Sequence, residues 1–204
     1  MAIANGGSLR APIKVGPITV ENAVFVAPFR NTVDMIEVTG QTMLSMFEFC
    51  AEKWSEDFSD TFAGFLQVSG MQVTYDIRRP VGKRVVEVLV TCTQCDVPRL
   101  EPLKKDSVYK ILAASFIIGG GDGFSMLPSN IIKRYNLGSL DTDILINYIK
   151  KNSPITTGLQ GRIRHLKDIE GGLDLKCLGN AARGHLSSIV LILVALGSWI
   201  FREM

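Results

Sequence analysis

The sequence predicts a mixed α/β (α+β) sandwich. Alternating or β-branched apolar runs at residues 33–38 and Val85–Thr91 are typical of strands. Apolar residues recur at helical spacing over residues 42–54 and 142–152, which is typical of amphipathic helices. Both tight-turn signals and longer helical connections join these elements, so we expect strands and helices to be mixed in one layered domain.

The N-terminal elements follow in order from turn and spacing signals. Residues 2–10 read as a short strand that runs into the turn Asn5-Gly6-Gly7-Ser8 and on to Arg10. Residues 18–26 read as a helix or a strand that stops before Pro28. A strand at residues 65–68 and another at residues 71–75 flank Ser69-Gly70, which predicts a hairpin.

The C-terminal elements are predicted in the same way. Residues 107–115 read as a strand that leads into a glycine loop, and residues 126–135 read as a helix. Asp141 is placed to cap the first turn of the helix at residues 142–152. After Ile163 the composition loosens into the polar, glycine-containing residues 167–172, which is typical of a tether, and His165 is assigned to this tether.

Composition limits the classes of protein that the chain can be. With 204 residues and 47% hydrophobic content, it is long for one compact domain and short for two, so we expect one domain with appendages. The net charge of +2, without basic runs interleaved with aromatics, argues against nucleic-acid binding. The four cysteines are too few for a disulfide scaffold and lack a second pair at zinc spacing.

The C-terminus has the pattern of a lipid-anchor signal. Residues 189–201 are almost purely apolar but reach only about two thirds of the hydrocarbon thickness of a bilayer at helical rise. Small residues at 179–182 and a polar spacer at 183–188 precede them, which predicts attachment of a glycosylphosphatidylinositol (GPI) anchor at Gly179, Asn180 or Ala181. A hydrophobic tail anchor and a C-terminal core helix are the alternatives.

The N-terminal sequence does not carry the export signal that the predicted GPI anchor requires. Residues 1–9 contain no signal peptide, although a GPI anchor requires export. We therefore expect the chain to be the C-terminal part of a longer polypeptide. In an exported chain Cys92-Thr93-Gln94-Cys95 would form a local disulfide rather than a redox catalyst.

A glycine loop is the strongest functional signal. The apolar run at residues 115–118 ends in Gly119-Gly120-Gly121-Asp122-Gly123-Phe124. Glycines let the backbone approach a flat, polyhydroxylated ligand, and the embedded carboxylate of Asp122 can accept hydrogen bonds from a vicinal diol. The alternative is a surface turn that happens to be rich in glycine.

The chain is equipped for binding rather than for catalysis. The two histidines, His165 and His185, fall outside the expected folded core, so a Ser/His/Asp triad and a His-rich metal site are both excluded there. The binding residues are an amide near the first turn, a guanidinium suited to phosphate, two aromatic rings able to stack on a base, and a diol-binding acid. In order they are Asn5, Arg10, Phe29, Phe116 and Asp122. Together they favour a nucleoside monophosphate or diphosphate as ligand.

Several motifs occur in an order that identifies a family. They are Asn5-Gly6-Gly7-Ser8-Leu9-Arg10, Val26-Ala27-Pro28-Phe29, Phe65-Leu66-Gln67-Val68-Ser69-Gly70, Val73-Thr74-Tyr75-Asp76, Cys92-Thr93-Gln94-Cys95 and Gly120-Gly121-Asp122-Gly123-Phe124. Over residues 3–165 the chain resembles the C-terminal domain of the 5'-nucleotidase and apyrase family, most of all the GPI-anchored animal ecto-5'-nucleotidases.

The resemblance implies an architecture and an activity. The fold would be the layered α/β/β/α sandwich of this domain type, truncated at its N-terminus. Residues 1–165 would be the nucleotide-binding domain, 166–182 the tether with the GPI attachment region, and 183–204 the cleaved signal. The family hydrolyses nucleoside 5'-monophosphates to nucleoside and phosphate with two zinc-type divalent metal ions. These are held by an N-terminal metallophosphatase domain that this chain lacks, so we expect no cofactor here and no AMP turnover by the chain alone.

The resemblance also implies roles for single residues. The base of AMP would be sandwiched between Phe29 and Phe116, Asn5 would face the base, Asp122 would hold the ribose hydroxyls, and Arg10 would reach the ribose and phosphate. Glycine backbone would border the ligand, and one disulfide would be formed. The glycines are Gly6, Gly7, Gly120, Gly121 and Gly123, and the disulfide joins Cys92 to Cys95.

Three departures from the family pattern leave alternatives open. Ser8, Arg30 and Gly119 stand where the family usually has Gly, Gly and Asn. Arg30 beside the stacking ring would narrow the base slot or favour extra phosphate. The expected protein is a 5'-nucleotidase on the extracellular face of the plasma membrane, with a homodimer as a possible state. The alternatives are a non-catalytic nucleotide-binding cell-surface protein and an apyrase that acts on ATP and ADP.

Overall fold

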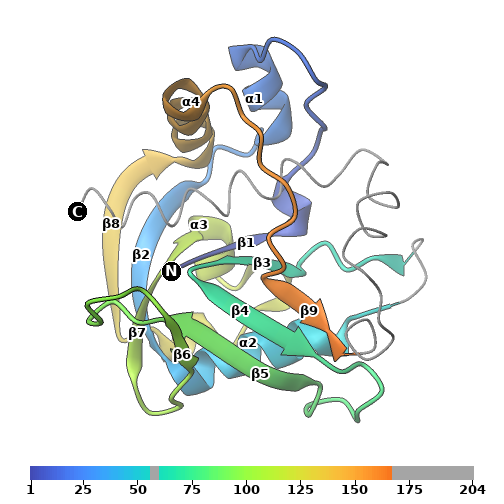
Figure 1. The fold of residues 1–204 in the computed structure, drawn as a ribbon, viewed down its shortest axis with the longest axis vertical. Coiled ribbons are helices and arrows are strands. Elements are labelled where there is room, and N and C mark those ends of the chain that lie inside the picture. The colour runs from blue at the N-terminus through green and yellow to red at the C-terminus, as the bar shows by residue number, and fades with distance from the viewer. Residues whose placement is uncertain (56–59, 167–204) are drawn as a thin grey trace.

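A computed structural model describes residues 1–55 and 60–166. Within these residues the fold contains two sheets and four α-helices, so the predicted mixed α/β class is confirmed (Figure 1). The five-stranded sheet has the strand order β3-β1-β7-β2-β8, and the four-stranded sheet has the order β6-β5-β4-β9.

The first sheet mixes parallel and antiparallel pairs. β7 is central: it pairs parallel with β1 and antiparallel with β2 along seven residue pairs. The strands of this sheet are β1 (Ala2–Asn5), β2 (Thr32–Thr39), β3 (Leu66–Ser69), β7 (Val108–Ala114) and β8 (Lys133–Leu140). The strands of the second sheet are β4 (Met71–Tyr75), β5 (Val85–Thr91), β6 (Leu100–Pro102) and β9 (Ile163–His165). The two glycine turns that were predicted to bind a ligand therefore follow neighbouring strands. The turn at residues 5–8 follows β1, and the turn at residues 119–124 follows β7.

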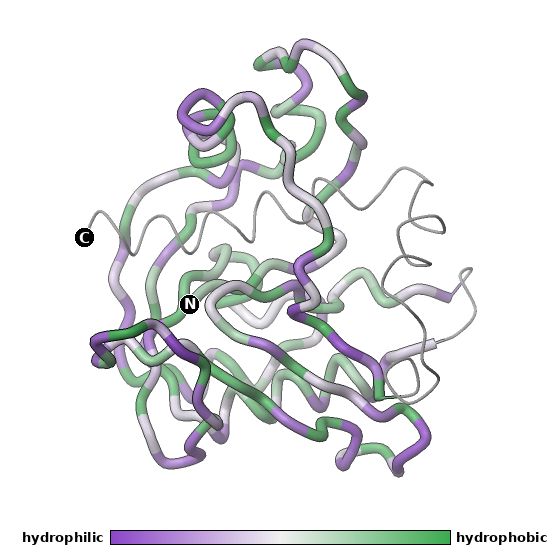
Figure 2. The backbone as a smooth tube through the Cα atoms, in the orientation of Figure 1, coloured by the Kyte–Doolittle hydropathy of each residue, from purple (hydrophilic) through white to green (hydrophobic). Residues whose placement is uncertain are grey.

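One hydrophobic core joins the two sheets through α2 (Gly40–Glu52). Buried side chains of this helix, among them Met43, Phe47 and Cys50, share a cluster with residues of both sheets. The helix starts where β2 ends, because the Thr39 hydroxyl accepts a hydrogen bond from the Thr42 amide at 3.2 Å. Apolar residues line the strands, whereas the connection between β4 and β5 is polar (Figure 2).

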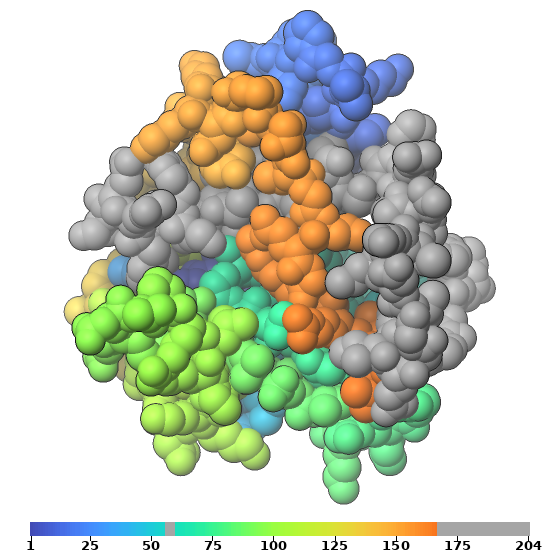
Figure 3. Space-filling model, viewed as in Figure 1, coloured from blue at the N-terminus to red at the C-terminus, as the bar shows by residue number. Residues whose placement is uncertain are grey.

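A second, smaller core lies between α1 (Val20–Val26) and α4 (Asp141–Asn152), which lie side by side in Figure 1. A capping box starts α1: Thr19 and Asn22 exchange side-chain and backbone hydrogen bonds. Asp141 is the first residue of α4 rather than its cap, and its carboxylate accepts from the Thr142 amide at 2.7 Å. Residues 153–162 cross the face of the molecule drawn in Figure 3 and lead from α4 to β9.

Two predicted elements were wrong. The expected hairpin at residues 65–75 does not form, because β3 pairs with β1 and β4 pairs with β5. Gly70, at φ 70°, turns the chain from one sheet into the other. The expected helix at residues 126–135 is instead the 3₁₀ turn Pro128–Asn130 followed by β8.

His165 belongs to the folded domain and not to a tether, which corrects a third prediction. It ends β9, which pairs in parallel with β4. Its ring lies 4.5 Å from that of Trp54 and stacks on that of Tyr75 at 6.0 Å, measured between centroids. The histidine therefore contributes to an aromatic cluster of the core. The assignments to residues 167–204, including the GPI attachment candidates Gly179, Asn180 and Ala181, lie outside the described residues.

Candidate functional site

The first glycine turn directly follows β1. Asn5 ends the strand, and a 3₁₀ turn, Gly6–Ser8, reverses the chain. The amides of Gly6 and Gly7 donate to Phe65 and Ala63 carbonyls at 3.0 and 2.6 Å. A Cβ on Gly7 would lie 2.8 Å from the Ala63 Cβ, so this position requires glycine for close approach of the two segments.

The second glycine turn follows β7 and the single-turn helix α3 (Ser115–Ile118). Gly120, Asp122 and Gly123 all have positive φ, at 91°, 53° and 90°. A Cβ on Gly121 would lie 2.6 Å from the Phe116 ring, so the ring of Phe116 lies directly against this backbone. The loop therefore presents a short acidic side chain and an aromatic ring from one compact turn.

A hydrogen bond joins the two turns. The Asn5 amide nitrogen donates to Oδ2 of Asp122 at 2.6 Å, across 117 positions of sequence. Asn5 is 4% exposed, so its amide is committed to positioning the carboxylate. The structure thus brings Asn5 and Asp122 together, and it adds an orienting role for Asn5 that the sequence did not reveal.

Arg10 and Phe29 lie beside the first turn. The Arg10 amide donates to the Val26 carbonyl at 2.9 Å, which fixes the turn to the end of α1. The Arg10 guanidinium carbon lies 6.0 Å from the centroid of the Phe29 ring, at the limit of a cation–π contact. Phe29 is 57% exposed and Phe116 is 46% exposed. Both rings therefore offer aromatic surface to a ligand instead of filling the core.

Aromatic side chains pack against the loop that carries Asp122, and the sequence analysis did not predict this packing. The ring of Phe49, on α2, makes edge-to-face contacts with Phe62 at 5.6 Å and with Phe124 at 5.1 Å. Gly64 is buried in this region, where a Cβ would lie 2.3 Å from the Phe62 ring and 2.8 Å from the Asp122 Cβ. The sequence does carry a signal for this packing, because Gly64 stands between two nearby phenylalanines, Phe62 and Phe65.

We expect Gly64→Ala to lower the free energy of unfolding by about 1–3 kcal/mol, because the added methyl group overpacks the contact between Phe62 and Asp122. Gly158→Ala is the matched control, since no atom lies within 4 Å of a Cβ there. The control should change stability by less than about 0.5 kcal/mol in urea unfolding. Equal stability of the two variants would contradict this packing.

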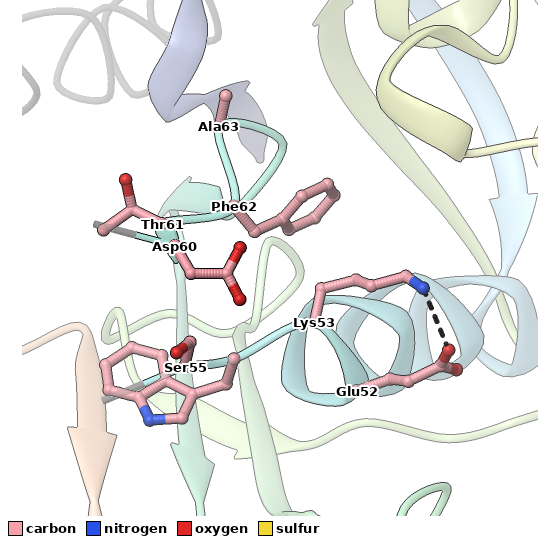
Figure 4. A pocket seen from close by; sticks show the side chains of 8 residues that line it. Glu52, Lys53, Ser55, Asp60, Thr61, Phe62 and Ala63 are labelled. Carbon is pink, nitrogen blue, oxygen red and sulfur yellow. Dashed lines mark ion pairs between the residues drawn. The ribbon is translucent and has the colours of Figure 1, made fainter. Parts of the chain in front are cut away.

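A polar pocket of about 480 Å³ borders the same segment, at the C-terminal end of α2 (Figure 4). The carboxylate of Asp60 and the ring of Phe62 face the helix end that carries Lys53, which pairs with Glu52 at 3.3 Å. The pocket is lined by Glu52, Lys53, Trp54, Ser55, Asp60, Thr61, Phe62 and Ala63. None of the five predicted binding residues is among these lining residues.

The three cysteines within residues 1–55 and 60–166 are structural. Cys92 and Cys95 form the predicted disulfide, with an S–S distance of 2.07 Å. Cys50 is buried, and desolvation raises the pKa of its thiol to about 12, so it stays protonated at neutral pH.

The described residues do not fit a two-metal hydrolytic centre. Within residues 1–55 and 60–166 the group of potential ligands that converges is Cys92, Cys95 and Glu101. Its two sulfur atoms are bonded to each other, so they cannot act as thiolate ligands. In the same part of the chain no helix has the length and apolar character needed to cross a membrane.

Comparison with known proteins identifies the domain. A sequence profile of the family described as "5'-nucleotidase, C-terminal domain" matches residues 1–129. An apyrase from Tabanus yao is 42% identical over 164 residues, which cover 80% of this chain and 29% of that protein. A 5'-nucleotidase from Bos taurus is 37% identical over 197 residues, which cover 95% of this chain and 32% of that protein.

A solved structure gives the same result. The crystal structure of a 5'-nucleotidase precursor from Thermus thermophilus matches with a TM-score of 0.73 and 35% identity, covering 80% of this chain and 31% of that chain. The chain thus spans about a third of the length of the relatives that it matches. With the profile match, the shared fold and the ordered motifs together, the chain belongs to the family of 5'-nucleotidase C-terminal domains.

Proposed function

We propose that this domain binds the nucleoside of a nucleoside 5'-monophosphate such as AMP, as the substrate-binding part of a 5'-nucleotidase that releases nucleoside and phosphate. The observation that carries the proposal is the hydrogen bond from Asn5 to Asp122. It joins one turn that holds Arg10 near Phe29 to a second turn that holds Phe116 against glycine backbone.

Each side chain has a chemical task in this proposal. Asp122 accepts hydrogen bonds from the ribose diol, as acidic residues do in other ribose sites. Phe29 and Phe116 stack on the base, which they can do because roughly half of each side chain is exposed. Arg10 carries a permanent charge that attracts the phosphate. Asn5 holds this carboxylate in place through its amide nitrogen.

The chemistry of the potential metal ligands bears on how the phosphate ester is hydrolysed. Within residues 1–55 and 60–166 the group that converges is Cys92, Cys95 and Glu101, and its two sulfur atoms are bonded to each other. We therefore propose that a metallophosphatase domain with two divalent metal ions acts on the phosphate, while this domain binds and orients the nucleoside.

The proposed location is the extracellular face of the plasma membrane, reached through a GPI anchor at Gly179, Asn180 or Ala181. Three features support it: the tail pattern in the sequence, the disulfide between Cys92 and Cys95, and similarity to animal 5'-nucleotidases. A homodimer is part of the same proposal and rests on the family resemblance alone.

An apyrase acting on ATP and ADP is the second candidate. The support is the similarity to the apyrase of Tabanus yao, at 42% identity. A non-catalytic nucleotide-binding protein would use the same residues, because the binding proposal does not depend on turnover.

Adenosine should bind to the 204-residue chain, and Asp122→Asn should weaken that binding roughly fivefold, because a charged acceptor contributes about 1 kcal/mol more than a neutral one. Asparagine tolerates the left-handed backbone at this position, so the loop should keep its shape. In calorimetric titration, 2'-deoxyadenosine should bind more weakly than adenosine to the wild type, and this difference should shrink in the variant.

Asp106→Asn is the matched control, because this exposed carboxylate lies in the turn before β7, at the end of the strand away from Asp122. Its affinity should stay within twofold of the wild type. Failure of the wild type to bind adenosine, or an unchanged preference for the 2'-hydroxyl in Asp122→Asn, would refute the assignment.

A further inference from the structure

Arg30 has an unusual backbone for its residue type. Its φ is 54°, and within residues 1–55 and 60–166 the other non-glycine residue with positive φ is Asp122. Short polar side chains such as Asp tolerate this conformation, whereas a long side chain such as Arg adopts it at a cost. Glycine would remove that cost, so the presence of arginine calls for a functional reason.

The scaffold on both sides of Arg30 imposes this conformation. Before it, the Ala27 carbonyl accepts a hydrogen bond from the Thr142 hydroxyl at 2.6 Å. After it, the Asn31 amide donates to the Asp141 carboxylate at 3.3 Å, and the Asp141 amide donates to the Asn31 carbonyl at 2.9 Å. The start of α4 therefore holds the turn at two points, and Arg30 is carried in a fixed place.

Arg30 brings a second cation to the Phe29 end of the site. It directly follows Phe29, so its Cα lies about 3.8 Å from that of Phe29. The Arg10 guanidinium is already 6.0 Å from the Phe29 ring. Arg30 is exposed, and among the described residues no hydrogen bond or ion pair engages its side chain. Its charge is therefore available to a ligand.

We propose that Arg30 is a specificity-determining residue that raises the affinity of this site for nucleoside di- and triphosphates, so that the site accepts them in addition to the monophosphate of the proposed function. The inference rests on the proposed function and names the substrate class of the same site. A planar guanidinium can bind phosphate oxygens through two parallel hydrogen bonds. Arg10 matches the single phosphate of a monophosphate, and Arg30 supplies the second cation that a longer phosphate chain needs.

The size of the effect follows from distance and screening. A side chain of this length keeps its charge within about 10 Å of Phe29, which is close to the Debye length at 0.1 M salt. At such distances each added phosphate charge changes affinity by a small factor, so we expect a total change of about 3- to 10-fold in the ratio of ATP affinity to AMP affinity. Uncharged adenosine should be unaffected.

The test compares the wild-type 204-residue chain with three variants, Arg30→Gly, Arg30→Asn and Arg30→Lys. Adenosine, AMP, ADP and ATP are titrated by calorimetry without divalent cations, at low and at high salt. The glycine and asparagine variants should bind adenosine within twofold of the wild type and lose the preference for ATP of about 3- to 10-fold. The lysine variant should keep most of the preference for ATP over AMP, and high salt should reduce this preference in the wild type.

Folding and net charge are controlled separately. The midpoint of urea unfolding should not fall in Arg30→Gly, because glycine accepts the left-handed backbone. Lys83→Asn removes an exposed cation from the connection between β4 and β5 and should leave the ATP-to-AMP ratio unchanged.

The outcomes separate this inference from the proposed function. If the wild type does not bind adenosine, the proposed function fails and the inference fails with it. If adenosine binds and Arg30→Gly keeps the wild-type ATP-to-AMP ratio, only the inference is overturned. A uniform change in the affinity of all four ligands would also overturn it, because Arg30 would then act on the base slot and not on the phosphates.

Discussion

The double substitution of Phe29 and Phe116 by alanine should weaken adenosine binding by roughly 30-fold to 10⁴-fold, the largest effect on affinity expected in this domain. Base–aromatic stacking contributes about 1–3 kcal/mol per ring, and each tenfold in affinity is about 1.4 kcal/mol. The two rings are held by separate segments, one before β2 and one on α3, so their contributions should add if they contact opposite faces of one base. Calorimetric titration of each single variant and of the double variant measures this.

Phe25→Ala provides the control for this experiment. Phe25 lies on α1 and is 59% exposed, which is close to the 57% of Phe29, so truncation removes a similar amount of exposed aromatic surface. It should leave adenosine affinity within twofold. All three substitutions should cost little stability, because none of these rings is buried. If the double variant binds adenosine as the wild type does, the two rings are not the base-binding walls.

The elements that were predicted best from the sequence are those whose secondary structure is determined by local residue preferences and spacing. The bounds of β5 and most of α2 followed from β-branched content and helical spacing. The need for glycine at Gly7 and Gly121 was also foreseeable, and the structure gives its reason in contacts shorter than 3 Å from a Cβ at either position. The reason at Gly121 is local, because Phe116 belongs to the same turn, whereas the reason at Gly7 is contact with Ala63 from a distant segment, which a local pattern does not show.

Strand partners could not be predicted in this way. Residues 65–75 looked like a hairpin, yet β3 and β4 belong to different sheets. Buried side chains of both strands, such as Leu66 and Val73, contribute to the same core. An alternating pattern therefore reports that a strand has a buried side, but not which neighbour completes its hydrogen bonds.

The failed helix at residues 126–135 has a different cause. Met126, Leu127, Ile131 and Ile132 recur at spacings that suit a helix. Pro128 instead begins a 3₁₀ turn, and the following residues pair with β2 along β8. Tertiary pairing outweighed the local preference here.

The candidate site was predictable only as a set of separate pieces. The hydrogen bond between Asn5 and Asp122 spans 117 positions, which no local pattern can reveal. The ordered family motifs pointed to the same five residues, because motif order stands in for the missing three-dimensional information. The contact of Phe49 with Phe62 and Phe124 beside the acidic loop needed coordinates, since Phe49 looks like an ordinary helix residue in the sequence.

An ion pair between an exposed arginine and a buried aspartate holds the strand that leads to α4. Asp34 of β2 is 2% exposed, and its Oδ2 accepts two hydrogen bonds from the Arg134 guanidinium of β8, at 3.0 and 2.5 Å. Its Oδ1 accepts a weaker one from the Leu137 amide at 3.3 Å. The pairing of β2 and β8 shifts register between Val33 and Met35, so the ion pair fixes the sheet where the strand ladder is interrupted.

Arg134→Met should therefore lower the free energy of unfolding by about 1–3 kcal/mol at neutral pH, because it leaves the buried Asp34 carboxylate without its charge partner, while the 41% exposure of Arg134 keeps the loss below that of a fully buried pair. Arg99→Met is the matched control: Arg99 pairs with Glu101 at 2.7 Å, but the side chains are 66% and 37% exposed, so the loss should stay below about 1 kcal/mol. Urea unfolding of both variants measures the difference, and equal losses would show that burial of Asp34 does not matter. Because β8 runs directly into Asp141, which holds the turn after Phe29, loosening this pair should also weaken adenosine binding before the whole domain unfolds.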